Sequence, residues 1–225
     1  MYLEIDTRAD AQYNPTGLLR VHHPHVDPQV SVSDCVSAKS VYEAPTRPTL
    51  SLSIGPAWRD SEGLWHTLAE HDDRVLRDTE VLIRNESIDC VEFEVVYRGA
   101  LGGNASAVRQ IFRVSPSSID VTDTVEGSNK MFRHYFPLFV TDGKQQTEIE
   151  VSGRHAAATH EEGSAQRYEV LDEGKSLVRL GVLEPSRNGA FDAAFVEGPE
   201  QTMRYSVRPI PRPGPAGGKQ EMEEL

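Results

Sequence analysis

The 225-residue sequence has little cysteine, few basic residues and no long apolar run. Its two cysteines, Cys35 and Cys90, are too few for a zinc site of their own or for a disulfide framework. They could still form one disulfide bond if the fold brings them together. No apolar run approaches the length of about 18 residues that a membrane helix needs. The sequence therefore predicts neither a membrane span nor a membrane partner.

The first ten residues, MYLEIDTRAD, lack the basic and apolar regions of a secretory signal. Two locations follow from this. The chain is expected in the cytoplasm if it is complete, and in the periplasm or outside the cell if it is a piece of a longer secreted enzyme. The sequence does not choose between them.

Acidic residues outnumber basic ones, 35 against 23, and the formal net charge is -12. An acidic surface repels phosphate backbones, and no cluster of Lys and Arg interrupts it. We therefore expect no nucleic-acid partner.

From residue 50 onward, apolar and polar residues alternate with a period of two, and turn residues separate the runs. Val91, Phe93, Val95 and Tyr97, for example, alternate with charged or small residues until Gly99. This pattern predicts an all-β protein, an antiparallel β-sandwich or supersandwich of roughly ten or more strands. The predicted strands are a hairpin around Ser61-Glu62-Gly63 that Trp58 and Trp65 flank, together with 50–54 (ended by Gly55-Pro56), 80–84, 91–97, 108–114, 119–125, 131–140, 147–151, 166–171, 177–183, 190–196 and 203–207.

The predicted domain organisation is one sandwich over residues 1–208 and a tail over 209–225. Prolines divide residues 1–49 into short extended pieces, so this part is expected to hold irregular edge strands and loops. The tail is rich in Pro and Gly and ends in acidic residues, so it is expected to be disordered.

The densest group of reactive side chains is His22-His23-Pro24-His25-Val26-Asp27. His23, His25 and Asp27 are candidate ligands for a divalent metal, zinc or calcium, if distant residues complete the set. His22 and His23 are also candidate general bases. The alternative is an exposed loop whose histidines are simply solvated.

A second group is Phe132-Arg133-His134-Tyr135-Phe136. On a strand, Arg133 and Tyr135 face one side, while His134 faces the other side with the two phenylalanines. A tyrosine and an arginine on a sheet face suit a sugar, because the ring stacks and the guanidinium binds a carboxylate. His134 or Tyr135 could also serve as a general acid or base. The alternative is an aromatic strand that packs the core.

Trp58, Trp65 and His66 form a third candidate group. Exposed tryptophans would offer a platform for stacking sugar rings, whereas tryptophan is more often found in a core. Asp120, Asp123 and Glu126 are of the right type for calcium, but they lack EF-hand spacing. No phosphate-binding loop or nucleophile elbow is present.

Four stretches carry a resemblance to a known family. They are Asn14–His22, Ser53–Trp58 followed by Leu64–Leu68, the strand pair 109–127, and Tyr135–Gly143. They resemble the C-terminal β-sandwich region of heparinase II/III-like polysaccharide lyases and related bacterial carbohydrate-active proteins. The resemblance spans most of residues 10–200.

The resemblance implies a two-part enzyme, in which a helical toroid and a β-sandwich enclose a uronic-acid polysaccharide and cleave it by β-elimination. Such chemistry needs a base, an acid and a group that neutralises the uronate carboxylate. His22, His23, His134 and Tyr135 are of suitable type for catalysis, and Arg133, Trp58, Trp65 and His66 for binding substrate. The chain has no helical toroid, so a helical catalytic domain or subunit is an expected partner. A non-catalytic carbohydrate-binding domain and a structural interaction domain remain as alternatives.

Overall fold

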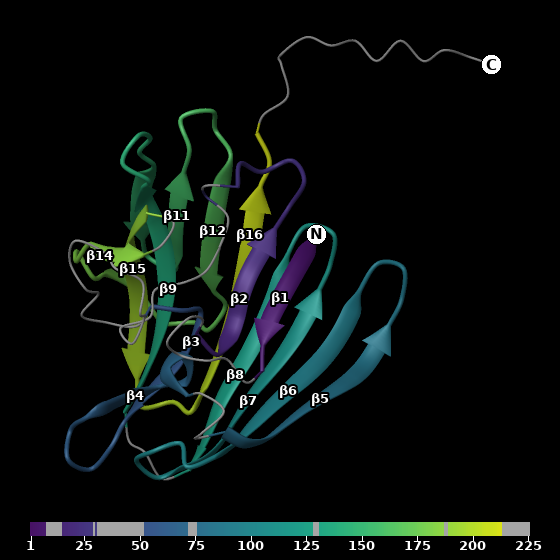
Figure 1. Ribbon diagram of the computed structural model, residues 1–225, viewed down its shortest axis with the longest axis vertical. Helices are drawn as coiled ribbons and strands as arrows, with labels where there is room; N and C mark the ends of the chain where they lie inside the picture. Colours follow the sequence, from purple (N-terminus) through teal and green to yellow (C-terminus); the bar gives the residue numbers. More distant parts are fainter. Residues whose placement is uncertain are drawn as a thin grey trace.

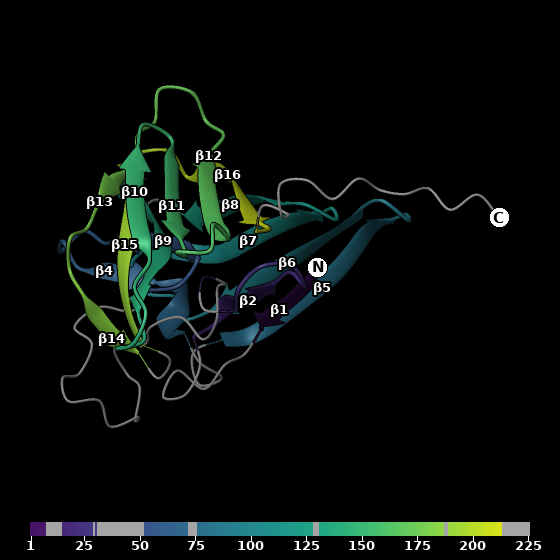
Figure 2. The ribbon, with the colours of Figure 1, turned by 90° about the horizontal axis from the view of Figure 1, so that it is seen from above.

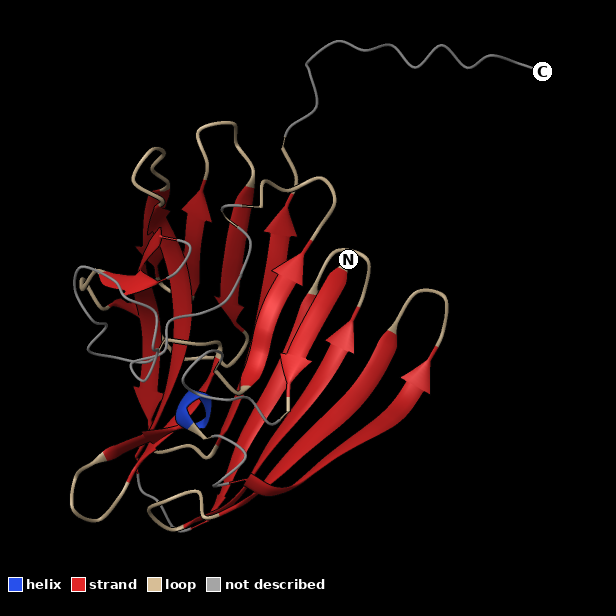
Figure 3. Ribbon diagram, in the orientation of Figure 1, coloured by secondary structure: helices blue, strands red, loops and turns tan. Residues whose placement is uncertain are grey.

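The computed structural model describes residues 1–7, 15–28, 30, 52–71, 76–127, 131–186 and 189–212. Strands dominate these residues, as Figure 3 shows, and each strand pair among them is antiparallel. The one helical element in the described ranges is a single 3-10 turn, η1 (Leu68–Glu70). The predicted all-β antiparallel sandwich is confirmed. No helix in this part of the chain is both long and apolar enough to cross a bilayer.

The larger sheet has eight strands in the order β10-β11-β12-β16-β8-β7-β6-β5. The strands are β5 (Leu76–Glu86), β6 (Val91–Gly99), β7 (Ala105–Val114), β8 (Ile119–Gly127), β10 (Glu148–Ser152), β11 (His155–Thr159), β12 (Ala165–Val170) and β16 (Thr202–Ile210).

The second sheet has six strands, in the order β13-β15-β9-β3-β4 with β14 also paired to β15. Its strands are β3 (Gly55–Arg59), β4 (Trp65–Thr67), β9 (Met131–Thr141), β13 (Val178–Arg179), β14 (Glu184–Ser186) and β15 (Gly189–Gly198). A separate two-stranded sheet pairs β1 (Tyr2–Asp6) with β2 (Gly17–His22).

The large sheet forms one layer and the two smaller sheets face it. A bridge between Leu18 and Ile54 joins β2 to the residues just before β3. Figures 1 and 2 show β1 and β2 lying against one face of the large sheet, beside the six-stranded sheet. In the same views the β5–β6 hairpin extends away from the rest of the molecule.

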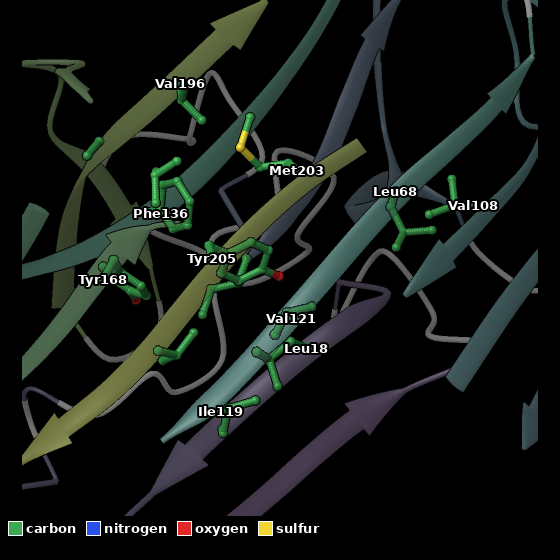
Figure 4. Close-up of a cluster of buried hydrophobic side chains, with 14 of the residues drawn as sticks. Leu18, Leu68, Val108, Ile119, Val121, Phe136, Tyr168, Val196, Met203 and Tyr205 are labelled. Carbon is green, nitrogen blue, oxygen red and sulfur yellow. The ribbon is translucent and has the colours of Figure 1, made fainter. Parts of the chain in front are cut away.

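The main core fills the space between these layers. Apolar side chains that alternate along the strands meet there, and each is almost fully removed from solvent. Figure 4 shows part of this cluster, including Leu18, Leu68, Val108, Val121, Phe136, Tyr168, Val196 and Tyr205. A smaller apolar cluster lies on the other side of the six-stranded sheet and contains Leu52, Ala57, Tyr135, Phe139, Phe191 and Ala193, with Trp65, Leu180 and Phe195 packed against it.

Gly55 and Pro56 begin a strand, whereas the sequence predicted that they would end one. Pro56 pairs with His134 of β9 on one side, and β4 pairs only with residues 57–59 on the other side. Pro56 thus stands at the start of β3, the part of a strand where proline is tolerated. The predicted hairpin between Trp58 and Trp65 is confirmed.

The predicted strand 177–183 is shorter than expected, since only Val178 and Arg179 pair with β15. Gly181 has a φ of 72°, in the left-handed region that interrupts an extended strand, and its N–H is bound by the Asp192 carboxylate. Strand β11 was not predicted, because its sequence HAAAT is rich in alanine, a residue with low β propensity.

The amino-terminal prediction concerned edge strands and loops over residues 1–49, and the described part of that range contains the β1–β2 pair. Residues 8–14, 29 and 31–49, and with them Cys35, lie outside the described residues. Cys90 is a free, partly exposed cysteine just before β6. Strand β16 continues to Ile210, and residues 213–225 of the predicted tail are not described.

Candidate functional site

The strongest candidate site lies on the face of the six-stranded sheet that points away from the main core. Antiparallel register brings Arg133 of β9 opposite Glu197 of β15, and Tyr135 opposite Phe195. Trp65 of β4 approaches from the other side. We call these five residues, Trp65, Arg133, Tyr135, Phe195 and Glu197, the aromatic–arginine platform.

The guanidinium of Arg133 is the centre of the platform. It lies 4.4 Å from the centroid of the Trp65 ring and 4.6 Å from that of Phe195. Cation–π attraction therefore holds it from two sides. Its Nε donates to Glu197 Oε2 at 2.7 Å, its Nη2 donates to the same oxygen, and its Nη1 donates to the Tyr135 hydroxyl at 2.9 Å.

These contacts fix the charge of Arg133. Partial burial acts to lower the pKa of its guanidinium, but the hydrogen bonds to Tyr135 and Glu197 outweigh burial and raise the pKa above its ordinary value. The side chain keeps 22% of its surface exposed. A guanidinium has five N–H donors, and three are engaged here by described residues, which leaves two for an acceptor from outside.

Tyr135 is 4% exposed, and its ring packs 6.2 Å from that of Phe195. Its hydroxyl oxygen accepts from Arg133, so the hydroxyl proton is free to be donated elsewhere. The platform thus combines a fixed cation with a neighbouring hydroxyl donor. This is a suitable pair for a ligand that carries a carboxylate or a sulfate beside a sugar oxygen.

His134 lies in the main core and does not belong to the platform. It is 2% exposed, and its Nε2 lies 2.5 Å from Asp123 Oδ2. The same carboxylate accepts from Gln110 Nε2 at 3.0 Å and from the Tyr205 hydroxyl at 3.2 Å. Burial, together with the charge of Asp123, raises the pKa of Tyr205 well above its ordinary value. As placed, His134 organises a buried polar network and does not reach a surface ligand.

Trp58 is also a core residue, with no exposed surface, and its Nε1 donates to the carbonyl of Gly102 at 3.2 Å. His66 stacks on it at 6.3 Å and contacts Asp60 Oδ2 through Nε2 at 2.8 Å. The Asp60 carboxylate also accepts from the backbone of the hairpin turn. The hydrogen bond with His66 makes the largest contribution to lowering the pKa of the Asp60 carboxyl group. Of the two tryptophans, only Trp65 takes part in the platform.

Residues 22–27, which we call the histidine loop, comprise the last residue of β2 and the turn that follows it. His22 is partly buried, 6.5 Å from the ring of Tyr2, and the rings of His23 and His25 are 5.6 Å apart. Burial, with smaller contributions from the chain amino group and His25, lowers the pKa of His23. The backbone N–H of Asp27 donates to Ser164 at 3.3 Å, which attaches the loop to the β11–β12 turn.

In the part of the chain that is described, no three His, Cys, Asp or Glu side chains converge into a set that could hold a metal. The metal site predicted at His23, His25 and Asp27 therefore gains no further ligand from the described residues. Asp123, a candidate calcium ligand, likewise belongs to no such group; it lies in the core at 1% exposure and contacts His134.

The histidine loop and the platform do not share a cleft. Figure 1 shows the loop after β2 in the upper part of the molecule and β4 near the bottom. Among the described residues, the hydrogen bonds and ring contacts of the histidine loop include those with Tyr2 and Ser164, whereas those of Arg133 involve Trp65, Tyr135, Phe195 and Glu197. Of the predicted residues, Arg133, Tyr135 and Trp65 meet on the platform. Trp58 and His134 lie in the core, and His66 packs on Trp58. The remaining four, His22, His23, His25 and Asp27, lie at the end of β2 and in the loop after it.

Two platform residues were not predicted from the sequence. Phe195 and Glu197 alternate along β15, and only the pairing of β15 with β9 brings them beside Tyr135 and Arg133. The alternation itself was visible, but it could not identify the partner strand. The acidic residue is the more important of the two omissions, because Glu197 decides how Arg133 is oriented.

Comparison with known proteins agrees with this architecture. A crystal structure of a heparan sulfate lyase mutant from Pedobacter heparinus matches with a TM-score of 0.55 at 10% identity, covering 82% of this chain and 30% of that chain. The lyase without mutation gives 0.54 with the same coverage, and a heparinase III gene product gives 0.51 at 14% identity, covering 81% and 29%.

These matches show the fold: the chain resembles the β-sandwich portion of heparinase-type lyases, as the sequence predicted. At 10–14% identity they do not carry function with them. The chain spans about 30% of the length of the lyases it matches. No family model matches the sequence, and no curated protein matches it.

Proposed function

We propose that the chain is the β-sandwich part of a polysaccharide-degrading, lyase-like protein that works with a helical catalytic domain or subunit. The single observation that carries this proposal is the likeness of the fold to one portion of two heparinase-type lyases. The lyases are more than three times as long as the matched region, so the remaining part of such an enzyme would have to come from elsewhere.

In this proposal the platform binds the acidic sugar. The two remaining N–H donors of Arg133 take the uronate carboxylate, and the exposed part of Trp65 lies against the ring. The Tyr135 hydroxyl donates a hydrogen bond to a sugar oxygen beside the carboxylate. Neutralising that carboxylate is what β-elimination requires of a binding residue, because the proton next to it must become acidic.

Catalysis is tested by incubating the full chain with heparan sulfate, alginate and a pectin-type substrate. Each cleavage by β-elimination leaves an unsaturated sugar that absorbs in the ultraviolet. The chain alone is expected to give little product, and a helical lyase domain added in trans is expected to raise the rate. If no acidic polysaccharide is cleaved under either condition, the enzymatic part of the proposal is wrong.

Binding is tested separately, by titrating the same polysaccharides into the native chain and three variants in calorimetry. Arg133→Ala and Trp65→Ala are expected to weaken binding at least tenfold, about 1.4 kcal/mol, through lost charge and lost stacking. Arg204→Ala is the matched control, since Arg204 is 59% exposed and paired with Asp172 on the other sheet. Equal affinity in all four proteins would place binding outside the platform.

A non-catalytic carbohydrate-binding domain is the second candidate. The position of His134 favours it, because the histidine next to Arg133 in sequence is buried against Asp123. The platform then lacks a histidine base among the predicted residues it brings together. This candidate predicts the same loss of binding in Arg133→Ala, and no unsaturated product even with a helical domain present.

A further inference from the structure

The outer edge of β5 exposes three consecutive apolar residues. In the middle of this strand, Val81, Leu82 and Ile83 are 54%, 43% and 68% exposed. β5 is the last strand of the eight-stranded sheet, and no strand in the described ranges pairs with its free edge. Figures 1 and 2 show this strand on the outside of a hairpin that stands clear of the sandwich. An edge of this kind presents unpaired backbone donors and acceptors to any strand that approaches.

An apolar groove of about 390 Å³ lies on the inner face beside this edge. Its lining consists of Leu3, Ile5, Thr7, Val81, Val91, Phe93, Val95 and Val114. The residue after β1 reaches β5 beside this groove, where the Thr79 hydroxyl donates to the carbonyl of Thr7 at 3.1 Å. Val81 and Ile83 alternate with Leu82, so they point towards the groove while Leu82 points to the opposite face of the sheet.

We propose that a second copy of this chain occupies the edge, so that β5 pairs with β5 of the partner about a two-fold axis at Leu82. Residues directly opposite each other in an antiparallel pair lie on the same face, so a two-fold axis must pass through a residue rather than between two residues. In this register Leu82 meets its own copy, and Val81 meets Ile83 of the partner on the groove side.

Charge selects this register. With the axis at Leu82, Glu80 of each copy lies opposite Arg84 of the other, which gives two complementary pairs. Moving the axis to Val81 places Glu80 opposite Leu82, and moving it to Ile83 places Glu80 opposite Glu86. Only the Leu82 axis therefore matches apolar residues with apolar residues and opposite charges with each other.

In the monomer, Glu80 and Arg84 each already have an ion-pair partner on β6. Arg84 donates through Nε to Glu94 Oε2 at 2.9 Å, and Arg98 Nη1 lies 3.5 Å from Glu80 Oε2. Pairing the two copies would join these ion pairs into one network across the axis. The register of β5 against β6 is regular from Asp78 to Ile83, and the shift between Ile83 and Asn85 places Arg84 at a β-bulge. Glu86 lies beyond that bulge, so Asp78 and Glu86 of the two copies are not held directly opposite each other.

The dimer is isologous and closed, because the free edge of each copy is consumed by the other. The eight-stranded sheets of the two copies become continuous, and Ile83 of the partner extends the wall of the groove. This inference is independent of the proposed function, since the platform lies on the six-stranded sheet.

Sedimentation velocity of the full chain at about 0.15 M salt, which screens the net charge of each copy, tests the proposal. The native chain is expected to dimerise with a dissociation constant on the order of 10 μM, as suits a small interface. Leu82→Lys and Leu82→Glu each place like charges opposite each other, and each variant alone is expected to be monomeric. An equimolar mixture of the two is expected to form a heterodimer.

Rescue in the mixture separates loss of the interface from loss of folding, because two misfolded chains would not restore each other. Ile88→Lys is the matched control: Ile88 is 98% exposed at the tip of the same hairpin, outside the paired stretch, and this variant is expected to dimerise like the native chain. A native chain that stays monomeric at ten times the expected dissociation constant overturns the proposal. Dimers that persist in both Leu82 variants overturn it as well.

Discussion

Removing the carboxylate of Asp123 is expected to be among the most damaging changes to the stability of this fold. Asp123 is 1% exposed and accepts hydrogen bonds from Gln110, His134 and Tyr205. Asp123→Ala would leave three buried donors without their acceptor. An unsatisfied buried donor costs about 1–3 kcal/mol.

Because neighbouring side chains and water can relax into the space, we expect a total loss of about 4 kcal/mol in the free energy of unfolding. With a urea m-value of about 2.5 kcal/mol/M, the unfolding midpoint would fall by about 1.6 M. The assay is urea unfolding followed by tryptophan fluorescence and circular dichroism together.

Asp120→Ala is the control for this experiment, because Asp120 lies on the same strand but on the opposite face, where it is half-buried. We expect a change of about 0.5 kcal/mol or less there. If Asp123→Ala costs less than about 1 kcal/mol, the network does not hold the two layers together and the reasoning from burial is wrong.

Two further predictions concern the large sheet. Burial acts to raise the pKa of Glu94, but the hydrogen bonds and charges of Arg84 and Arg109 together outweigh it and hold the pKa below its ordinary value. A lowered pKa adds stability above the ordinary pKa of a glutamate and loses it as pH falls through the folded value. Glu94→Gln should thus cost about 2 kcal/mol in urea unfolding near neutral pH and progressively less in acid; a pH-independent difference would refute this. Gly127 has a φ of 146°, and an added Cβ would lie 2.0 Å from the carbonyl oxygen of Asn104. Gly127→Ala should therefore reduce the free energy of unfolding by about 2 kcal/mol and lower the thermal midpoint by several degrees. An unchanged midpoint would contradict this.

The sequence predicted the faces of individual strands well. Period-two alternation placed Arg133 and Tyr135 on one side of β9 and His134 on the other, and the structure confirms this division. The prediction depends only on the pleat, which sends successive side chains to opposite faces whatever the neighbours are. The same rule located most strands, but Gly55 and Pro56, which were predicted to end a strand, begin one.

The sequence could not predict which faces meet. Trp58 and Trp65 both flank one turn, yet Trp58 is fully buried and Trp65 packs on Arg133. The sequence makes His134 a candidate for catalysis, but its partner Asp123, on a strand of the other sheet, holds it in the core. These outcomes depend on the order of strands in the sheets, and alternation carries no information about that order.

The sequence by itself determined that this chain forms antiparallel strands with one apolar side each, because alternation and turn residues are local properties of the backbone. Only the tertiary structure decided which residues form a site. Glu197 reaches Arg133 across 64 positions of sequence, and the histidine loop, which is denser in reactive groups, lies at the other end of the molecule. The physical reason is that a side chain's chemistry depends on burial and partners, and strand pairing between distant segments sets both.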